Sequence, residues 1–234
     1  MALPPSGTTD EAFVREVDEE YRRDQLTNIW RNYGRWIVVA VIAALAALAL
    51  YLYLGHRSTT QAGVQGEQLD GALRLIEENQ PDKAGPELDK LAKEGTDGYS
   101  AVARISQANL LLAKNDTKGA AAKFAEIAGN AGYAQPYRDL AVLRQTAIEY
   151  DTLKPEVVID RLKGLAVATS PWFGSAGEMV AAAYLKQGKR GDAGKLYGQV
   201  AQGGDNVPET IRQRAVQLAG VLGVDATTKE AQAK

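Results

Sequence analysis

The chain lacks cysteine altogether and holds a single histidine, His56, among its 234 residues. Disulfide bonds and cysteine-based metal sites are therefore excluded. A nucleophile activated by histidine, or a metal site built from histidines, would have to depend on His56 alone, which argues against both. We expect no catalytic residue, no metal ligand and no cofactor, and we predict that the protein is not an enzyme. Catalysis by carboxylates alone stays open.

An excess of one charge is missing too, because 27 Lys and Arg stand against 29 Asp and Glu. Proteins that bind nucleic acid usually present a strong basic excess on one face, so no nucleic-acid partner is expected. Three Phe and three Trp leave little material for a large aromatic core. The 23 Gly and the many Ala suit small, closely packed helices instead.

One long apolar run is present, from Trp36 to Leu54, without a charged or amide side chain. A helix of this length spans roughly 28 Å, close to the thickness of the hydrocarbon core of a bilayer. Its Leu, Ile and Val residues contribute roughly −3 to −6 kcal/mol toward insertion. A buried helix of a soluble core would normally carry a polar face, which this run lacks. We therefore predict a transmembrane anchor over 36–54 that contacts the lipid bilayer.

A cleaved export signal is the main alternative to an anchor. It would need a short basic leader and an apolar region of about 7 to 15 residues. Here the segment 1–35 precedes the run and includes the acidic stretch 18–20, so an anchor that stays in the chain is favoured. Aromatic residues, which favour the lipid headgroup level, lie near both ends of the run. They are Trp30, Tyr33, Trp36, Tyr51 and Tyr53.

Arginine residues on the two sides of the run predict its orientation. Those before it are Arg22, Arg23, Arg31 and Arg35. Those within a similar distance after it are Arg57 and Arg74. Since positive flanks stay in the cytoplasm, residues 1–35 are expected there and the rest of the chain outside it.

The segment before the run is expected to contain an amphipathic helix over 10–30. Phe13, Val17 and Tyr21 fall along one side of it at helical spacing. It is either a docking helix for a partner or a helix that rests on the membrane surface, and the second is favoured. Residues 1–9 are expected to be disordered.

After residue 58 the sequence lacks the alternating pattern of strands and shows amphipathic segments separated by Gly, Pro and Asn. This pattern predicts an all-α domain of helical hairpins over 58–223, followed by a disordered tail over 224–234. The expected helices are 60–79, 86–94, 98–114, 117–128, 137–150, 155–166, 174–187, 190–202 and 208–221.

Two of these hairpins, 108–127 and 181–200, align without a gap. The matched pairs are Ala108 with Ala181, Leu111 with Tyr184, Asn115 with Gly188, Ala120 with Ala193, Phe124 with Tyr197 and Ile127 with Val200. This order of small, turn and aromatic residues resembles the tetratricopeptide pattern and predicts an α-solenoid. Alanine lets the two helices approach, and Asn or Gly accepts the left-handed conformation that ends the first helix. The intervening segment 137–165 has room for one repeat but matches the pattern poorly.

A tetratricopeptide stack presents a concave groove lined by the first helix of each hairpin, so we expect a protein-binding surface there. By position in the repeat, the groove residues are Asn109, Leu112, Ala113, Ala182, Leu185 and Lys186. Trp172 and Phe173 precede one such helix. They are interpreted as a recognition patch or as a core plug between repeats, and the plug is favoured.

The whole layout resembles the bacterial YfgM-like proteins, which are accessory subunits of the SecYEG translocon. YSAVARISQANLLLAKNDTKGAAAKFAEIA (99–128) and GEMVAAAYLKQGKRGDAGKLYGQV (177–200) carry the resemblance, together with the anchor. It implies a bacterial inner-membrane protein whose repeat domain lies in the periplasm. The implied partners are the SecYEG translocon, a membrane-anchored periplasmic chaperone and unfolded client proteins. The N-terminal extension is longer than expected of that family.

Four hypotheses on function remain from the sequence. The first is a translocon accessory that passes secreted proteins to periplasmic chaperones. The second is a general scaffold for cell-wall or outer-membrane assembly, which has the same architecture. The third is an enzyme that uses carboxylates, and the fourth is an oligomerisation device.

Overall fold

The structure is a computed structural model that describes residues 8–226, with side chains from residue 30 on except 32 and 58. Within this range the chain forms helices, turns and loops and no strand, which confirms the predicted all-α fold. Its contacts divide the chain into two units, residues 1–61 and 62–234.

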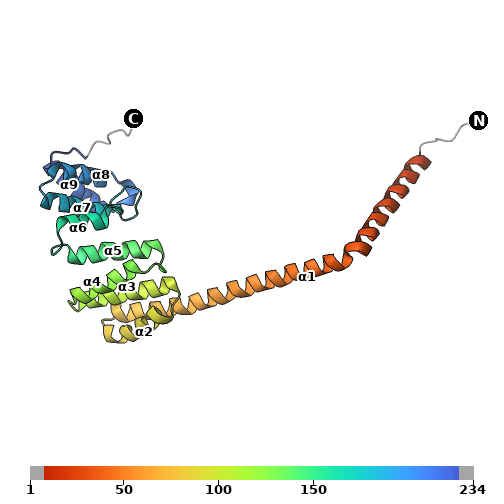
Figure 1. Cartoon of the computed structure of the whole chain (residues 1–234), viewed down its shortest axis with the longest axis horizontal. Helices are drawn as coiled ribbons and strands as arrows, with labels where there is room; N and C mark the ends of the chain where they lie inside the picture. The colour runs from red at the N-terminus through yellow and green to blue at the C-terminus, as the bar shows by residue number, and fades with distance from the viewer. Residues whose placement is uncertain (1–7, 227–234) are drawn as a thin grey trace, which may run out of the picture. The chain divides into compact units, whose positions relative to one another are not determined.

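The first unit is the N-terminal part of helix α1, which runs from Thr8 to Glu77 (Figure 1). The apolar run lies inside this helix, where an 18-residue window has a mean hydropathy of 2.7 and no buried residue. Ile42, for example, is 60% exposed although it is fully apolar. One helix of the described chain is therefore long and apolar enough to cross a membrane.

The helix expected over 10–30 is not separate, because α1 continues through it into the apolar run. Its amphipathic side chains lie outside the residues whose side chains are described. Of the segment expected to be disordered, Thr8 and Thr9 are helical. Residues 1–7 lie outside the described range.

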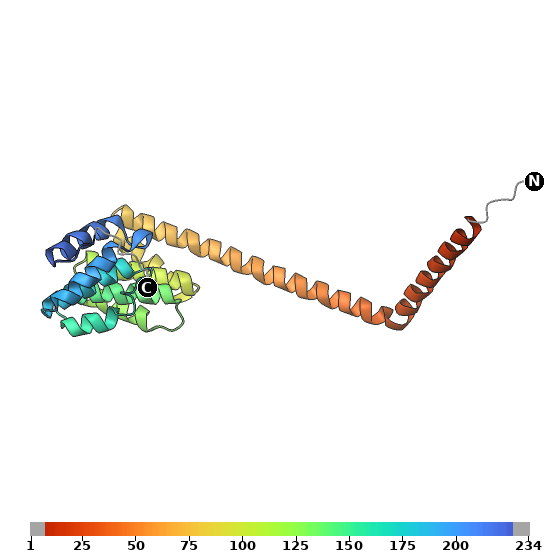
Figure 2. The same ribbon diagram turned by 90° about the horizontal axis from the view of Figure 1, so that it is seen from above.

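The second unit is a series of helices in which each packs against the next along the chain (Figure 2). It begins with the last turns of α1. The helices that follow are α2 (Pro81–Glu94), α3 (Asp97–Ala113), α4 (Thr117–Gly129), α5 (Gln135–Glu149), α6 (Pro155–Leu162), α7 (Phe173–Lys186), α8 (Arg190–Ala201), the short 3₁₀ helix η1 (Gly204–Asn206) and α9 (Glu209–Val221).

The core of this unit is a chain of four apolar clusters rather than one central core. Each cluster joins three or four consecutive elements, as in stacked repeats. The clusters centre on Leu88 and Leu91, on Phe124 and Ile127, on Val158 and Leu162, and on Phe173 and Tyr197. Every cluster also contains alanines that are fully buried, so the helices approach closely.

Four helices end in the same way. The second residue after the helix takes a left-handed conformation, at Asn79, Asn115, Gly188 and Gly223. The next N–H then bonds back to the carbonyl five residues earlier, over 2.8 Å from Asp116 to Leu111 and 2.9 Å from Lys189 to Tyr184. These hydrogen bonds satisfy carbonyl groups that have no partner within the helix. It ends α1, α3, α7 and α9.

Helix α5 ends differently from these four helices. Tyr150 after it keeps right-handed helical angles, and the N–H groups of Thr152 and Leu153 both bond to the Glu149 carbonyl. The residues that follow α5 include no Gly or Asn that would favour a left-handed turn. This is the hairpin whose sequence matches the repeat pattern poorly.

Three helix boundaries differ by more than two residues from those predicted. The helix expected to begin at residue 60 does not start there, because α1 continues into it from Thr8. Helix α2 begins at Pro81 and not at residue 86, since either proline can start a helix and the earlier start buries Ala84 completely. Helix α6 ends at Leu162 and not at 166, because the chain turns there and the N–H groups of Leu165 and Ala166 both donate to the Leu162 carbonyl.

The packed chain also extends beyond residue 223. Val224 lies against α8, where its Cγ atoms would be 3.0 and 3.2 Å from a Cβ on Gly194 and Gly198. Ala226 is buried in the same cluster. The tail expected to be disordered from 224 on is therefore packed at 224–226, and residues 227–234 lie outside the described range.

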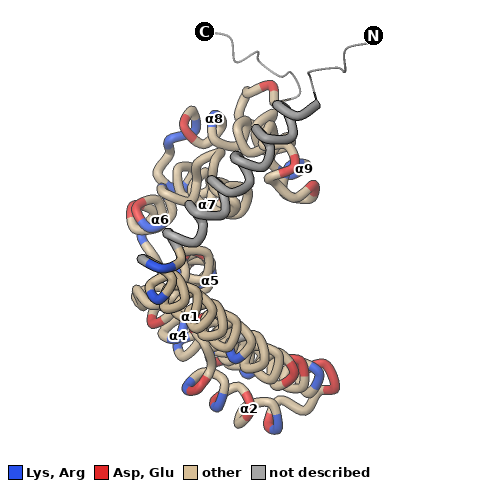
Figure 3. Tube along the Cα trace, turned by 90° about the vertical axis from the view of Figure 1, so that its right-hand side faces the viewer, with Lys and Arg blue, Asp and Glu red and all other residues tan. Residues whose placement is uncertain are grey.

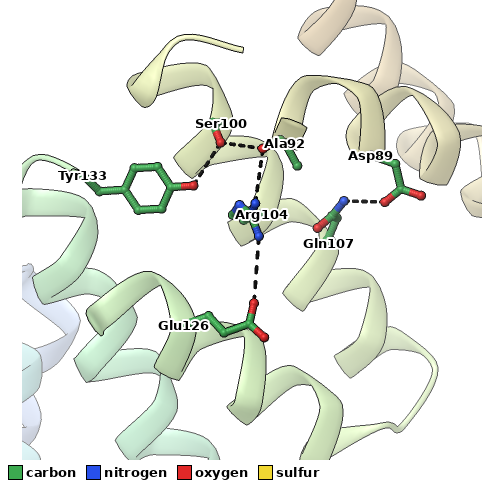
Figure 4. A network of polar contacts seen from close by, with 7 residues as sticks. All are labelled: Asp89, Ala92, Ser100, Arg104, Gln107, Glu126 and Tyr133. Carbon is green, nitrogen blue, oxygen red and sulfur yellow. Dashed lines mark hydrogen bonds and ion pairs between the residues drawn. The ribbon is translucent and has the colours of Figure 1, made fainter. Parts of the chain in front are cut away.

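A small polar network closes the junction of α2, α3 and α4 (Figure 4). The Ala92 carbonyl at the end of α2 accepts hydrogen bonds from Ser100 Oγ at 2.8 Å and Arg104 Nη2 at 3.4 Å. Ser100 also bonds the Tyr133 hydroxyl at 2.9 Å. Gln107 Nε2 donates to Asp89 at 2.6 Å, so the buried Ser100 and Gln107 side chains are both paired.

Candidate interaction surface

The two aligned hairpins, α3–α4 and α7–α8, place equivalent residues in equivalent environments. The small residues Ala108, Ala120, Ala181 and Ala193 are all 0% exposed. The aromatic positions are also buried, with Phe124 at 0% and Tyr197 at 2%. These residues pack α3 and α7 into their hairpins, while other residues of the same two helices stay accessible to solvent.

The six residues predicted to line a groove lie beside the hairpin cores, on the accessible surface of α3 and α7. Asn109, Ala113 and Lys186 are exposed, and Leu112, Ala182 and Leu185 are half-buried. Leu112 and Leu185 also touch the apolar clusters beside them. None of the six is fully buried. They form two separate sets, one on α3 and one on α7.

Helix α5 supplies the residue that meets the set on α3. The Arg144 guanidinium donates a hydrogen bond to Asn109 Oδ1 at 2.9 Å and lies 5.8 Å from the centre of the Phe124 ring. Its partners are a neutral amide and a ring, and it forms no ion pair in the described part of the chain. Arg144 therefore brings an unbalanced positive charge to this exposed surface.

The set on α7 meets the end of α5 at Lys186. Its ammonium group lies 3.6 Å from the Asp151 carboxylate and 4.2 Å from the centre of the Tyr150 ring. Burial, and then the charge of Asp151, raise the pKa of Tyr150 above its ordinary value, so this hydroxyl stays neutral at physiological pH. Tyr150 also reaches the Met179 carbonyl at 3.4 Å.

A third contact joins α7 to α9. Arg214 donates two hydrogen bonds of 2.7 Å to the Glu178 carboxylate, a forked arrangement that fits the planar guanidinium. The bond to Glu178, helped by its charge, raises the pKa of Arg214 further above its ordinary value. Glu178 lies one helical turn from Ala182, so this pair extends the surface of the second set.

Arg144, Asp151 and the pair of Glu178 with Arg214 were not predicted from the sequence. The partners in these contacts are 35 residues apart for Asn109 and Arg144, and 36 apart for Glu178 and Arg214. Both separations are close to the 34-residue period of the tetratricopeptide repeat. Polar residues one repeat apart on first helices were therefore the signal that could have found them.

The remaining features of the surface are mixed in character. Phe173 is 2% exposed and Trp172 packs on an apolar cluster, which favours the core plug over a recognition patch. Acidic and basic residues are interspersed along the helices (Figure 3). Among the side chains that the structure describes, no three from His, Asp or Glu lie together as metal ligands would.

Comparison with known proteins identifies the family of the repeats. A family model described as a tetratricopeptide repeat-like domain matches residues 28–219. No curated protein and no solved structure matches the chain.

Proposed function

The chain belongs to the tetratricopeptide repeat-like domain family, and from this premise we propose that it is a membrane-anchored module that binds other proteins. The observation that carries the proposal is the accessible surface of α3 and α7, where small, apolar and charged residues are exposed or half-buried. Tetratricopeptide-like domains act through such surfaces as non-catalytic interaction modules. Residues Asn109, Leu112, Ala113, Ala182, Leu185 and Lys186 are the proposed contact residues.

The proposed arrangement has a cytoplasmic segment at 1–35, an anchor at 36–54 and a repeat domain from 58 on. The excess of arginine before the apolar run supports a cytoplasmic N-terminus. The repeat domain then lies in the periplasm of a bacterial cell. A unique thiol tests this arrangement, because the chain has no cysteine of its own. A Gln199→Cys variant in whole cells should react with a thiol reagent that cannot cross the inner membrane, and an unreactive thiol would contradict it.

The proposed partners are the SecYEG translocon and a membrane-anchored periplasmic chaperone, with unfolded secreted proteins as clients. The anchor, the repeats and the segments 99–128 and 177–200 support this role through their resemblance to translocon accessory subunits. In this role the repeat domain holds an emerging chain near the exit of the translocon until a chaperone takes it.

The test is to crosslink the full-length protein in its native membrane and identify what co-purifies with it. Translocon subunits or an anchored periplasmic chaperone are the expected partners. Cell-wall or outer-membrane assembly factors in their place would overturn the translocon role and support an envelope scaffold. A matched control carries the anchor but lacks the repeats, and should lose the partners if the repeats bind them.

A further inference from the structure

Two arginines precede the apolar run of α1 on one side of the helix. Arg31 and Arg35 are four residues apart, which places them about 40° apart around the helix and about 6 Å apart along it. Both side chains are exposed. Arg35 is also the residue directly before Trp36, where the apolar run begins.

Neither arginine has an acidic neighbour with which to pair. Between Asp24 and Glu67 the sequence contains no Asp or Glu. Asp24 lies seven residues before Arg31, beyond the three- and four-residue spacings at which side chains on a helix meet. Among the described side chains, no ion pair involves Arg31 or Arg35. Two positive charges therefore stand uncompensated at this end of the run.

The apolar run fixes the depth of these charges in a bilayer. A bilayer is about 40 to 45 Å thick with its headgroups, around a hydrocarbon core of about 30 Å, so each headgroup layer is roughly 5 to 8 Å deep. With Trp36 at the edge of the core, the Cα atoms of Arg35 and Arg31 lie about 1.5 and 7.5 Å beyond it along the helix. Both arginines therefore fall in the headgroup layer, where the lipid phosphates lie.

Tryptophan rings hold the two arginines at this level. The Arg35 guanidinium lies 6.0 Å from the centre of the Trp36 ring, within the range of a cation–π contact. The Trp30 ring lies against the helix at Gly34, where a Cβ would be 3.3 Å from the ring atom Cδ2. Indole rings favour the boundary between the apolar and polar layers, so they keep this segment where lipid phosphates can reach it.

The other end of the run lacks this arrangement. Tyr51 and Tyr53 lie there and are exposed, but Arg57 is followed by no further Arg or Lys until Arg74. A pair of arginines one helical turn apart is thus confined to the N-terminal end of the run.

We propose that Arg31 and Arg35 form a binding site for the phosphate of anionic phospholipid headgroups. A planar guanidinium can donate two hydrogen bonds to a phosphate, and both arginines reach the headgroup layer from one side of the helix. A zwitterionic lipid carries its own cation and leaves the arginine charges unbalanced, whereas an anionic lipid neutralises one of them. The site rests on the proposed anchor and gives its N-terminal end a preference for anionic lipid.

The test measures which lipids touch this end of the anchor. The chain has three tryptophans, so Trp172→Phe leaves Trp30 and Trp36, both beside the arginines. This full-length variant is reconstituted alone in vesicles of equal parts phosphatidylcholine and phosphatidylglycerol. One lipid at a time carries bromine near the headgroup end of its acyl chains, which quenches tryptophan fluorescence on contact. The quenching should show an at least about fivefold preference for phosphatidylglycerol, the effect of one neutralised charge.

Matched variants place the preference at the two arginines. Arg31→Gln combined with Arg35→Gln should bring the ratio of the two lipids close to one. Arg22→Gln combined with Arg23→Gln removes the same charge about 12 Å farther along the helix and should leave most of the preference. Arg57→Gln, at the other end of the run, should leave it unchanged. A preference that survives in the first variant, or that is lost equally in the second, would overturn the site.

The outcomes separate this site from the proposed anchor. Quenching by neither brominated lipid would show that the segment does not enter the bilayer, which would remove the anchor and the site together. Equal quenching by both lipids, with Arg31 and Arg35 in place, would keep the anchor and overturn the lipid site. The two arginines would then be free for an acidic segment of a protein partner.

Discussion

The hairpins α3–α4 and α7–α8 pack in similar ways but with different side chains. Both bury alanines where their helices cross, and both end the first helix with a left-handed residue, at φ 62° for Asn115 and 74° for Gly188. They differ in the buried aromatic, which is Phe124 in one and Tyr197 in the other. The comparison teaches that the repeat requires small residues where the helices cross and a buried aromatic ring beside them, while the polarity of that ring varies.

The start of the second helix differs as well. Asp116 accepts a hydrogen bond from the Gly119 N–H at 2.9 Å and so caps α4. Lys189 stands at the same place before α8 with nearly the same backbone angles, φ −82° and ψ 64° against −84° and 74°, and makes no cap. Substitutions at matched positions of the two hairpins can test each of these likenesses and differences.

Removing the buried aromatic should give the largest effect, and a similar one in each hairpin. Phe124→Ala and Tyr197→Ala each leave a cavity at a site that is at most 2% exposed. We expect losses of about 3 to 5 kcal/mol in the free energy of unfolding. Urea unfolding of the full chain in micelles measures them. Losses below about 1 kcal/mol for either variant would show that its aromatic position is not a core position.

Alkaline pH should destabilise the hairpin α7–α8, which contains Tyr197, more than the hairpin α3–α4. Burial, with smaller effects of Glu178 and Tyr150, raises the pKa of Tyr197 to about 12. Because the folded pKa lies above the ordinary value of 10, the neutral hydroxyl's contribution is complete below pH 10 and is lost as the pH rises toward 12. Tyr197→Phe should reduce this alkaline loss of stability, and Phe124→Tyr should increase it. Urea midpoints that fall equally in all three proteins between about pH 10 and pH 12 would refute the assignment to Tyr197.

The left-handed turns should respond alike to alanine. Gly188→Ala introduces a Cβ into that conformation, and Asn115→Ala replaces a residue that tolerates it by one that does not, so each should cost about 1 to 2 kcal/mol. Asn115→Gly should be nearly neutral. Gly191→Ala is the matched control, since its Cβ meets nothing within 4 Å and an ordinary helical alanine should stabilise by about 0.5 to 1 kcal/mol. A thermal melt gives the order, and a stabilising Gly188→Ala would contradict the turn.

The caps should give the smallest effect, with opposite signs. Asp116→Ala removes the cap of α4 and should cost about 1 kcal/mol, whereas Lys189→Asp supplies one to α8 and should gain up to about 1 kcal/mol. In a domain of this size the melting temperature should shift by about 2 to 4 °C per kcal/mol. Asp116→Asn is the control and should change little. A Lys189→Asp variant that melts lower would show that the two helix starts are not equivalent.

Most of the fold could be predicted from local sequence patterns. Alanine at the crossings, Asn or Gly at the turns and an aromatic one turn later specified α3–α4 and α7–α8 nearly to the residue. The same reasoning failed where the sequence signal is weak or where two residues give the same signal. Pro81 and Pro86 offered two starts for α2, and the long amphipathic pattern after Pro155 hid the early end of α6.

The candidate surface was harder to predict, because its contacts join residues a full repeat apart. Asn109 could be placed from its position in the repeat, but its partner Arg144 lies in the hairpin that matches the pattern poorly. Packing of Val224 on Gly194 and Gly198 was hidden for a similar reason, since it depends on space that only two glycines in a distant helix leave open.

The central claim is that the accessible surface of α3 and α7 binds other proteins. A photo-crosslinking amino acid at Ala113 or Ala182 in the full-length protein, in its native membrane, tests this most directly. Ala125, an alanine exposed on the second helix α4, is the matched control position. The account predicts protein crosslinks from Ala113 and Ala182, with translocon or chaperone subunits among them, and few from Ala125. Crosslinks from Ala125 alone, or from none of the three positions, would contradict it.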